Sequence, residues 1–138
     1  MNAARISTDL REYVRQRAEH RCEYCLLAED DAFFAHEVDH IIADKHGGPT
    51  AAHNLALACF DCNRFKGSDI ASLDPLTGSL VPLFDPRQDC WKDHFEIHDA
   101  RIYPLTDVGR ATERLLKLNL PIRIAVRRKL VAVGRYPA

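Results

Sequence analysis

The hydrophobic residues of this 138-residue chain fall into short runs with different periodicities, which predicts a mixture of small helices and strands. In the first run, Leu10, Val14 and Ala18 recur every four residues and would share one face of a helix. Residues able to cap the start of this helix directly precede the run: Ser7, Thr8 and Asp9. We therefore expect an amino-terminal helix that ends close to the first cysteines of the chain.

The middle of the chain predicts the order strand, loop, strand and helix across residues 33–67. Aromatic and branched residues from Phe33 to Ile42 favour a strand. The segment 45–50 contains two glycines and a proline, which is typical of a loop. The apolar run Leu55–Ala58 predicts a strand that returns beside the first one, and Asp61–Lys66 then predicts a short helix.

The remaining patterns predict two further strands, Leu80–Phe84 and Phe95–Tyr103, followed by two helices, Asp107–Leu118 and Pro121–Val133. There is no internal repeat and no low-complexity segment. The expected fold class is therefore α+β, and the length suits a single domain that spans residues 1–138.

The net charge of −1 conceals an uneven distribution of charge along the chain. Residues 1–100 carry 10 Lys and Arg against 18 Asp and Glu, a net charge of −8, whereas residues 101–138 carry 9 against 2, a net charge of +7. One interpretation is that the segment 101–138 is a basic extension that meets a polyanion such as DNA. The other is a helix surface that is solvated or packs near the acidic part of the same chain.

No apolar stretch approaches the roughly 20 residues that a membrane-spanning helix requires. The amino-terminal segment 1–5 also lacks the apolar run of a secretory signal. We therefore expect a cytoplasmic protein that does not enter a membrane and whose thiols stay reduced.

Four of the five cysteines form two Cys-x-x-Cys pairs, Cys22/Cys25 and Cys59/Cys62. Each pair brings two thiolates within reach of one ion, and two pairs complete the tetrahedral sulfur shell of a structural zinc site. The other interpretations are four small buried thiols or a redox pair, and no βαβ pattern surrounds either pair to favour the latter. A closed four-sulfur site leaves no position for substrate, so any chemistry must come from other residues. Cys90 is left over and is expected to be a free thiol.

The segment between the two cysteine pairs contains Val38-Asp39-His40-Ile41-Ile42, His46-Gly47-Gly48 and Asn54-Leu55, and the second pair continues as Cys62-Asn63-x-x-Lys66-Gly67. Together with both cysteine pairs, this string resembles the HNH endonuclease family in its four-cysteine, zinc-binding form. The resemblance covers residues 22–67, with every signature position present and in order. It implies a ββα-metal core, to which the chain adds an amino-terminal helix and carboxy-terminal strands and helices.

The resemblance also implies a role for each polar residue of the motif. Asp39 would bind a catalytic divalent ion, His40 would act as the general base, and Asn54 would tie down the loop between the two strands. Asn63 would be a second ligand of the ion, at a position where the family often has histidine. An amide oxygen in that place suits a hard ion such as magnesium or manganese better than zinc.

The chemistry of phosphodiester hydrolysis supports these assignments independently. A divalent ion held by few protein ligands stabilises charge on the leaving and non-bridging oxygens. Histidine is a suitable base for water near pH 7. Because adjacent residues of a regular strand face opposite ways, Asp39 and His40 can serve one phosphate only if the strand ends or bends there.

We expect DNA contacts from basic residues on two of the predicted helices, although simple solvation would also explain them. These residues are Arg64 and Lys66 after the second cysteine pair, and Arg123, Arg127 and Arg128 in the basic extension. Taken together, the sequence predicts a metal-dependent DNA endonuclease with a structural zinc ion and catalytic magnesium or manganese. The alternatives are a catalytically silent zinc module that binds nucleic acid or protein, and a zinc-supported hydrolase of another phosphoester.

Overall fold

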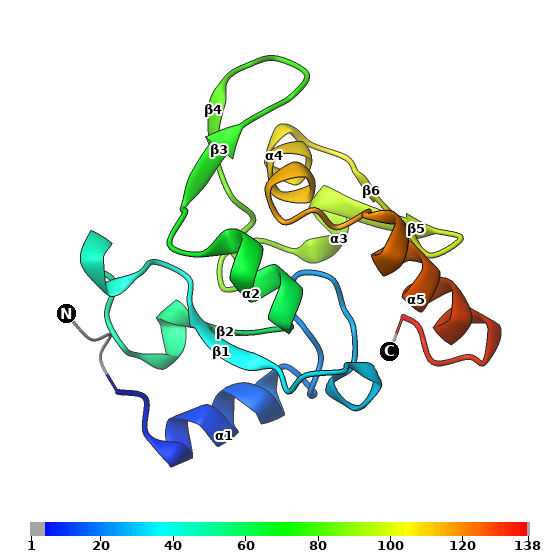
Figure 1. Ribbon diagram of the computed structural model, residues 1–138. Coiled ribbons are helices and arrows are strands. Elements are labelled where there is room, and N and C mark those ends of the chain that lie inside the picture. Colours follow the sequence, from blue (N-terminus) through cyan, green and yellow to red (C-terminus); the bar gives the residue numbers. More distant parts are fainter. Residues whose placement is uncertain (1–4, 138) are drawn as a thin grey trace.

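A computed structural model describes residues 5–137 of the protein. Residues 1–4, most of the segment in which no signal run was found, lie outside the described part. Figure 1 shows a central strand pair between two helices, with the carboxy-terminal elements gathered at one side. The helices are α1 (Thr8–Arg17), α2 (Phe60–Lys66), α3 (Trp91–His94), α4 (Asp107–Leu115) and α5 (Pro121–Ala132), with 3₁₀ turns at Glu29–Asp31, Asp44–His46 and Ala52–Asn54. The strands are β1 (Glu37–His40), β2 (Leu55–Ala58), β3 (Ala71–Leu73), β4 (Leu80–Pro82), β5 (Phe95–His98) and β6 (Arg101–Pro104).

The strand pair β1–β2 and the helix α2 form the predicted ββα unit, which confirms the α+β class. The two strands are antiparallel, and Asp39 lies opposite Ala56. Successive residues of a strand face opposite sides. On one side, Val38, Leu55 and Leu57 pack with the apolar stripe of α1 in one core cluster. On the other side, Ala56 and Ala58 pack with the four cysteines.

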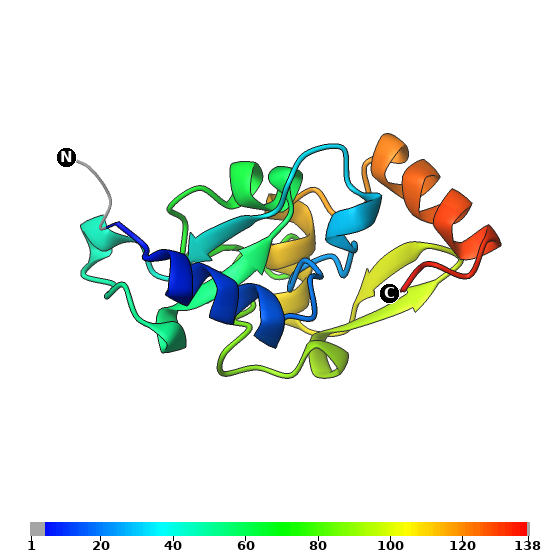
Figure 2. The ribbon, with the colours of Figure 1, turned by 90° about the horizontal axis from the view of Figure 1, so that it is seen from below.

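Helix α1 covers the outer face of this strand pair, as Figure 2 shows from below. Ser7 is its cap, because the Ser7 hydroxyl accepts a hydrogen bond from the Leu10 amide at 3.1 Å. The basic last turn of α1 then reaches backbone carbonyls beside the strands. Arg17 donates to the carbonyl oxygens of Ala52 at 2.9 Å and Leu55 at 2.7 Å. The helix is therefore fixed to the strand pair by hydrogen bonds as well as by its apolar stripe.

The predicted strand Phe33–Ile42 is shorter in the structure, where β1 contains only Glu37–His40. Its partner β2 also has four residues, so four pairs complete the ladder. Beyond the ladder, the amide of Ile42 bonds to the side chain of Asn54 at 2.9 Å in place of a strand backbone. The sequence pattern located the apolar segment correctly, but it could not predict the length of β2, the partner strand that limits the length of β1.

The prediction of one strand over Phe95–Tyr103 was wrong, because this segment is the hairpin β5–β6. The turn consists of Asp99 and Ala100, which have φ values of 49° and 68°. Two consecutive residues with positive φ are characteristic of a tight hairpin turn, which Asn-Gly or Asp-Gly would signal and Asp-Ala does not. Strand β3 was not predicted; it pairs with β4, and both strands contact α4.

The main core joins the two halves of the chain. One buried cluster contains the four paired cysteines together with Phe84, Phe95, Ile102 and Leu116. The elements β5, β6 and α4 therefore pack against the ββα unit. Among the described residues, no helix is both long and apolar enough to cross a membrane.

Candidate functional site

The four cysteines of the two pairs meet in one buried cluster, as the sequence predicted. Their sulfur atoms all lie within 4.8 Å of one another, and the sulfurs of Cys25 and Cys59 are 3.6 Å apart. A tetrahedral zinc site with bonds of about 2.3 Å places its sulfurs about 3.8 Å apart. Each pair also forms a tight turn, in which the Cys25 amide donates to the Cys22 sulfur and the Cys62 amide to the Cys59 sulfur, both at 3.4 Å. The donor set and its spacing fit a zinc ion.

The carboxy-terminal part of the chain holds the same cluster from outside. The Tyr136 hydroxyl donates to the carbonyl of Cys25 at 2.7 Å, and the Trp91 indole donates to the carbonyl of Tyr24 at 2.9 Å. Arg123 reaches the sulfurs directly. The backbone of the first cysteine pair is therefore braced by residues far away in the sequence.

The structure corrects the expectation that Arg123 and Arg127 present a basic face to DNA. The two residues are only 7% and 2% exposed. Arg127 donates to the carbonyl of Ala100 at 2.8 Å and to Asn119 at 3.2 Å. Neither guanidinium is free for a phosphate. Arg128 does face solvent, with a side chain 58% exposed and an ion pair to Asp99 at 3.4 Å.

Other arginines of the basic extension also pair within the chain. Arg110 forms a two-pronged ion pair with the buried Asp74, at 2.8 and 2.9 Å, and Arg135 pairs with Asp31 at 2.7 Å. The Arg110 guanidinium holds the pKa of Asp74 well below its usual range. Several cations of the basic extension thus pair with acidic residues of the segment 1–100, as the second interpretation of the charge pattern proposed.

Asp39 lies on the inner face of β1, buried against the last turn of α2. The Lys66 ammonium is 3.1 Å from the Asp39 carboxylate and donates to the carbonyl of His40, also at 3.1 Å. Burial raises the pKa of Asp39, and the Lys66 charge opposes this rise. Lys66 itself is 2% exposed, so the expectation that it contacts a DNA phosphate is wrong. Its charge instead supports the carboxylate proposed as a metal ligand.

His40 is the last residue of β1, where the strand ends as the joint use of Asp39 and His40 requires. Its ring is half-buried, and its Nε2 atom lies 2.8 Å from the Thr50 hydroxyl in the connecting loop. Among the described residues, the other ring nitrogen has no hydrogen-bond partner. The ring is therefore oriented through one nitrogen while the other stays free.

Asn54 fixes the loop that connects β1 to β2. Its side-chain oxygen accepts from the Ile42 amide at 2.9 Å, and its nitrogen donates to the carbonyls of Ile42 at 2.9 Å and Pro49 at 2.8 Å. Gly48 makes this packing possible, because a Cβ atom there would lie 1.8 Å from the Ile42 carbonyl oxygen and 2.8 Å from the Asn54 nitrogen. The Asn54 side chain thus holds the loop that carries Thr50.

Asn63 and Arg64 lie in the middle of α2, between the cysteines and Lys66. Asn63 is half-buried, and its side chain has no hydrogen bond within residues 5–137. Arg64 is exposed, 3.4 Å from Asp61, and its guanidinium stacks on the rings of Phe60 and Phe65. Of the residues predicted to bind DNA, Arg64 and Arg128 are therefore the two with exposed charges.

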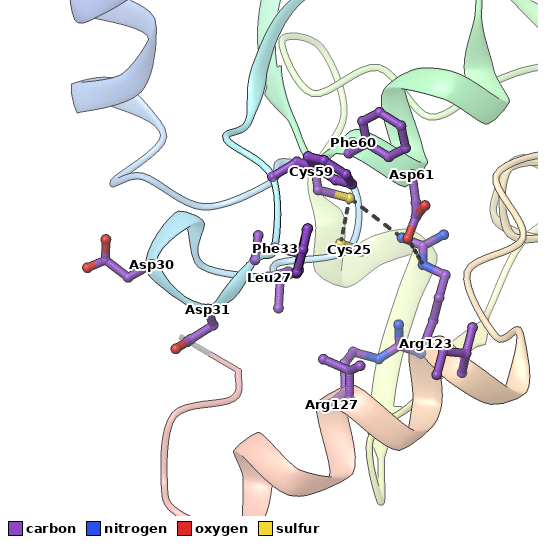
Figure 3. A pocket seen from close by; sticks show the side chains of 14 residues that line it. Cys25, Leu27, Asp30, Asp31, Phe33, Cys59, Phe60, Asp61, Arg123 and Arg127 are labelled. Carbon is purple, nitrogen blue, oxygen red and sulfur yellow. Dashed lines mark hydrogen bonds and ion pairs between the residues drawn. The ribbon is translucent and has the colours of Figure 1, made fainter.

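A cavity of about 490 Å³ opens beside the cysteine cluster and not beside Asp39 and His40 (Figure 3). Cys25, Cys59 and Arg123 line its floor, and the exposed Phe33 and Phe34 line its edge. None of the polar motif residues from Asp39 to Asn63 contributes to it. The candidate catalytic groups lie instead at the end of β1, where Asp39 is buried and His40 is half-buried.

Sequence reasoning missed the partners that orient the site. Thr50 at His40, Tyr24 near Asp39 and the carboxy-terminal Tyr136 are single residues without a motif. Burial raises the pKa of Tyr24, and the charge of Asp39 raises it further. Only the position of Tyr24 inside the first cysteine pair could have drawn attention to it.

Comparison with known proteins supports the family resemblance. The family model for HNH endonuclease matches residues 22–69, about a third of the chain. The match covers both cysteine pairs, β1, β2 and α2. Neither the search of curated proteins nor the search of solved structures gives a significant match. Residues 22–69 thus match the HNH endonuclease family, which suggests nuclease activity on nucleic acid.

Proposed function

We propose that this protein is a metal-dependent endonuclease that hydrolyses phosphodiester bonds of DNA. The observation that carries the proposal is the pair Asp39 and His40 at the end of β1, inside the segment that matches the HNH family. Asp39 is supported by Lys66 and His40 by Thr50, at 3.1 and 2.8 Å. Both side chains are thus held in place, which general acid–base and metal-assisted chemistry requires.

Asp39 and Asn63 are the proposed ligands of the catalytic ion. A carboxylate and an amide provide oxygen donors, which magnesium and manganese prefer. Asp39 is paired with Lys66 at 3.1 Å, and the Asn63 side chain has no hydrogen bond within residues 5–137. When bound, such an ion stabilises negative charge on the phosphate oxygens. The Lys66 ammonium keeps the buried Asp39 oriented and compensates its charge.

His40 is the proposed general base. The Thr50 hydroxyl fixes one ring nitrogen, which leaves the other to take a proton from the attacking water. Asn54 acts at a distance, because it holds the loop from which Thr50 contacts the ring. In agreement with the family resemblance, the products would carry 5′-phosphate and 3′-hydroxyl ends.

The test is nicking of supercoiled plasmid in the presence of magnesium, manganese, calcium or zinc. The wild-type protein should nick with magnesium or manganese. His40→Ala should lower the rate roughly 10²–10⁴-fold, the usual contribution of a positioned general base, with unchanged zinc content. His53→Ala is the matched control, because His53 is an exposed histidine of the same loop region.

Equal nicking by the two histidine variants would show that His40 is not the base. Absence of nicking by wild type with every ion, together with retained binding of nucleic acid, would instead identify the silent zinc module.

A further inference from the structure

The buried side chain of Arg123 extends from helix α5 to the cysteine cluster, although α5 lies outside the segment that matches the HNH family. Figure 3 shows the Arg123 guanidinium pointing from α5 toward Cys59 and Asp61. Its Nη2 atom lies 3.1 Å from the Cys62 sulfur and 3.7 Å from the Cys59 sulfur. A cationic side chain from outside the matched segment is therefore in direct contact with two of the four sulfurs.

The position of this guanidinium is fixed from its other side. Its Nη1 atom donates to the carbonyls of Leu116 at 2.7 Å and Lys117 at 3.1 Å, where α4 ends. Asp61, on the first turn of α2, lies 3.8 Å from Nε. The guanidinium therefore bridges the end of α4 and the start of α2, and its planar fork suits several acceptors at once.

The charge balance of a zinc-loaded cluster explains why a cation is needed there. Four thiolates and one zinc ion carry a net charge of about −2, and all four cysteines are buried. A buried charge without a partner is strongly unfavourable. The Arg123 guanidinium, itself buried, supplies a positive charge within hydrogen-bonding distance of two of these sulfurs.

We infer that Arg123 is a member of the zinc site, a positioning residue that neutralises and hydrogen-bonds the thiolates and so slows the release of zinc. The helix α5 thereby becomes part of the metal site that holds the HNH core. This inference rests on zinc binding by the four cysteines and is independent of DNA cleavage.

The test compares full-length, zinc-loaded variants by the rate at which zinc passes to a chromogenic chelator. Arg123→Met removes the charge and the donors while keeping much of the side-chain volume. Loss of a residue that supports metal ligands typically costs 10–100-fold in metal affinity, so zinc release should accelerate at least about tenfold. Arg123→Lys restores the charge and should recover part of this loss.

Arg127→Met is the matched control. Arg127 is a buried arginine of the same helix that binds backbone and Asn119 instead of sulfur, so its loss disturbs packing without touching the cluster. A second readout uses cobalt in place of zinc. Arg123→Met should move the sulfur-to-cobalt charge-transfer bands to lower energy, because its sulfurs lose a donor, whereas Arg127→Met should leave the bands in place.

Zinc release from Arg123→Met at the wild-type rate would overturn the inference. So would an equal acceleration of zinc release in both methionine variants, if the cobalt bands of Arg123→Met stay in place. If Arg123→Met fails to fold, the lysine variant decides. Its cobalt bands should move and its zinc release should be faster than wild type, and unchanged values of both would refute the role.

Discussion

The two ends of helix α2 differ in how firmly the structure holds them. At its start, Cys59 and Cys62 are buried, and Arg123 contacts both. At its end, about 10 Å away along the helix axis, Lys66 supports Asp39 and the adjacent His40. The carboxy-terminal half of the chain braces the first end through Arg123, Trp91 and Tyr136, and a cavity opens beside it. The second end has a half-buried histidine with one free nitrogen.

This difference suggests a division of labour. A closed four-sulfur site contributes folding free energy and leaves no coordination position for substrate. At the other end of α2, Asp39 and Lys66 form a buried ion pair, whereas the ring of His40 is only half-buried. The cysteine end of the short ββα unit is held by residues from α4 and α5 and, in the zinc-loaded form that we expect, also by the metal ion.

The largest effect is expected from breaking the zinc end. Cys59→Ser should unfold most of the protein, because structural zinc contributes on the order of 10 kcal/mol to folding. Circular dichroism and elemental analysis would measure the loss of structure and of metal. Cys90→Ser is the control, since Cys90 is exposed and outside the cluster. A well-folded, zinc-free Cys59→Ser protein would remove the basis of the comparison.

A smaller effect is expected from breaking the ion pair between Lys66 and Asp39 at the other end of α2. Lys66→Met should destabilise the protein by roughly 3–5 kcal/mol, because it leaves the buried Asp39 without its partner. Denaturant unfolding would measure this. In the double variant Asp39→Asn/Lys66→Met, a large part of the loss should be recovered, since no charge stays buried. Equal destabilisation by the single and double variants would show that the pair is not what holds this end.

Asn54→Ala should cost less, roughly 1–3 kcal/mol, because buried backbone groups of Ile42 and Pro49 lose their partner. The same variant should slow nicking, since the loop that carries Thr50 loosens, while zinc content stays constant. The neighbouring exposed His53→Ala provides the reference for both measurements. Wild-type stability in Asn54→Ala would mean that the loop is held by other contacts.

The smallest effects concern DNA binding by exposed charge. Arg64→Gln on α2 should weaken binding to all sequences and reduce the slope of log affinity against log salt by about 0.9, the contribution of one phosphate contact. Arg128→Gln tests the same property on α5. Fluorescence anisotropy across a salt series would measure the DNA affinity and the salt slope of each variant. A change in Arg128→Gln alone would place the DNA on the α5 side and contradict a contact at α2.

The sequence was sufficient for the elements whose signals are local. Cys-x-x-Cys spacing predicted the cluster of Cys22, Cys25, Cys59 and Cys62, and two short apolar segments followed by a helix signal predicted the order of β1, β2 and α2. These features depend on residues a few positions apart, where spacing limits geometry strongly. Strand lengths and the hairpin turn at Asp99 were less predictable, because they depend on the partner strand and on unusual backbone angles.

What only the tertiary structure decided was where each charged side chain points. Cationic residues such as Arg123, Arg127 and Lys66 are typical of DNA-binding surfaces, but all three are buried here. Arg123 contacts Cys62 from 61 positions away, and Lys66 contacts the strand residue His40 from 26 positions away. A long cationic side chain goes inside only where folding brings acceptors and negative charge around it. The sequence alone therefore predicted the cysteine cluster and the order of the motif residues, whereas only the packing of the helices determined which cations contact them.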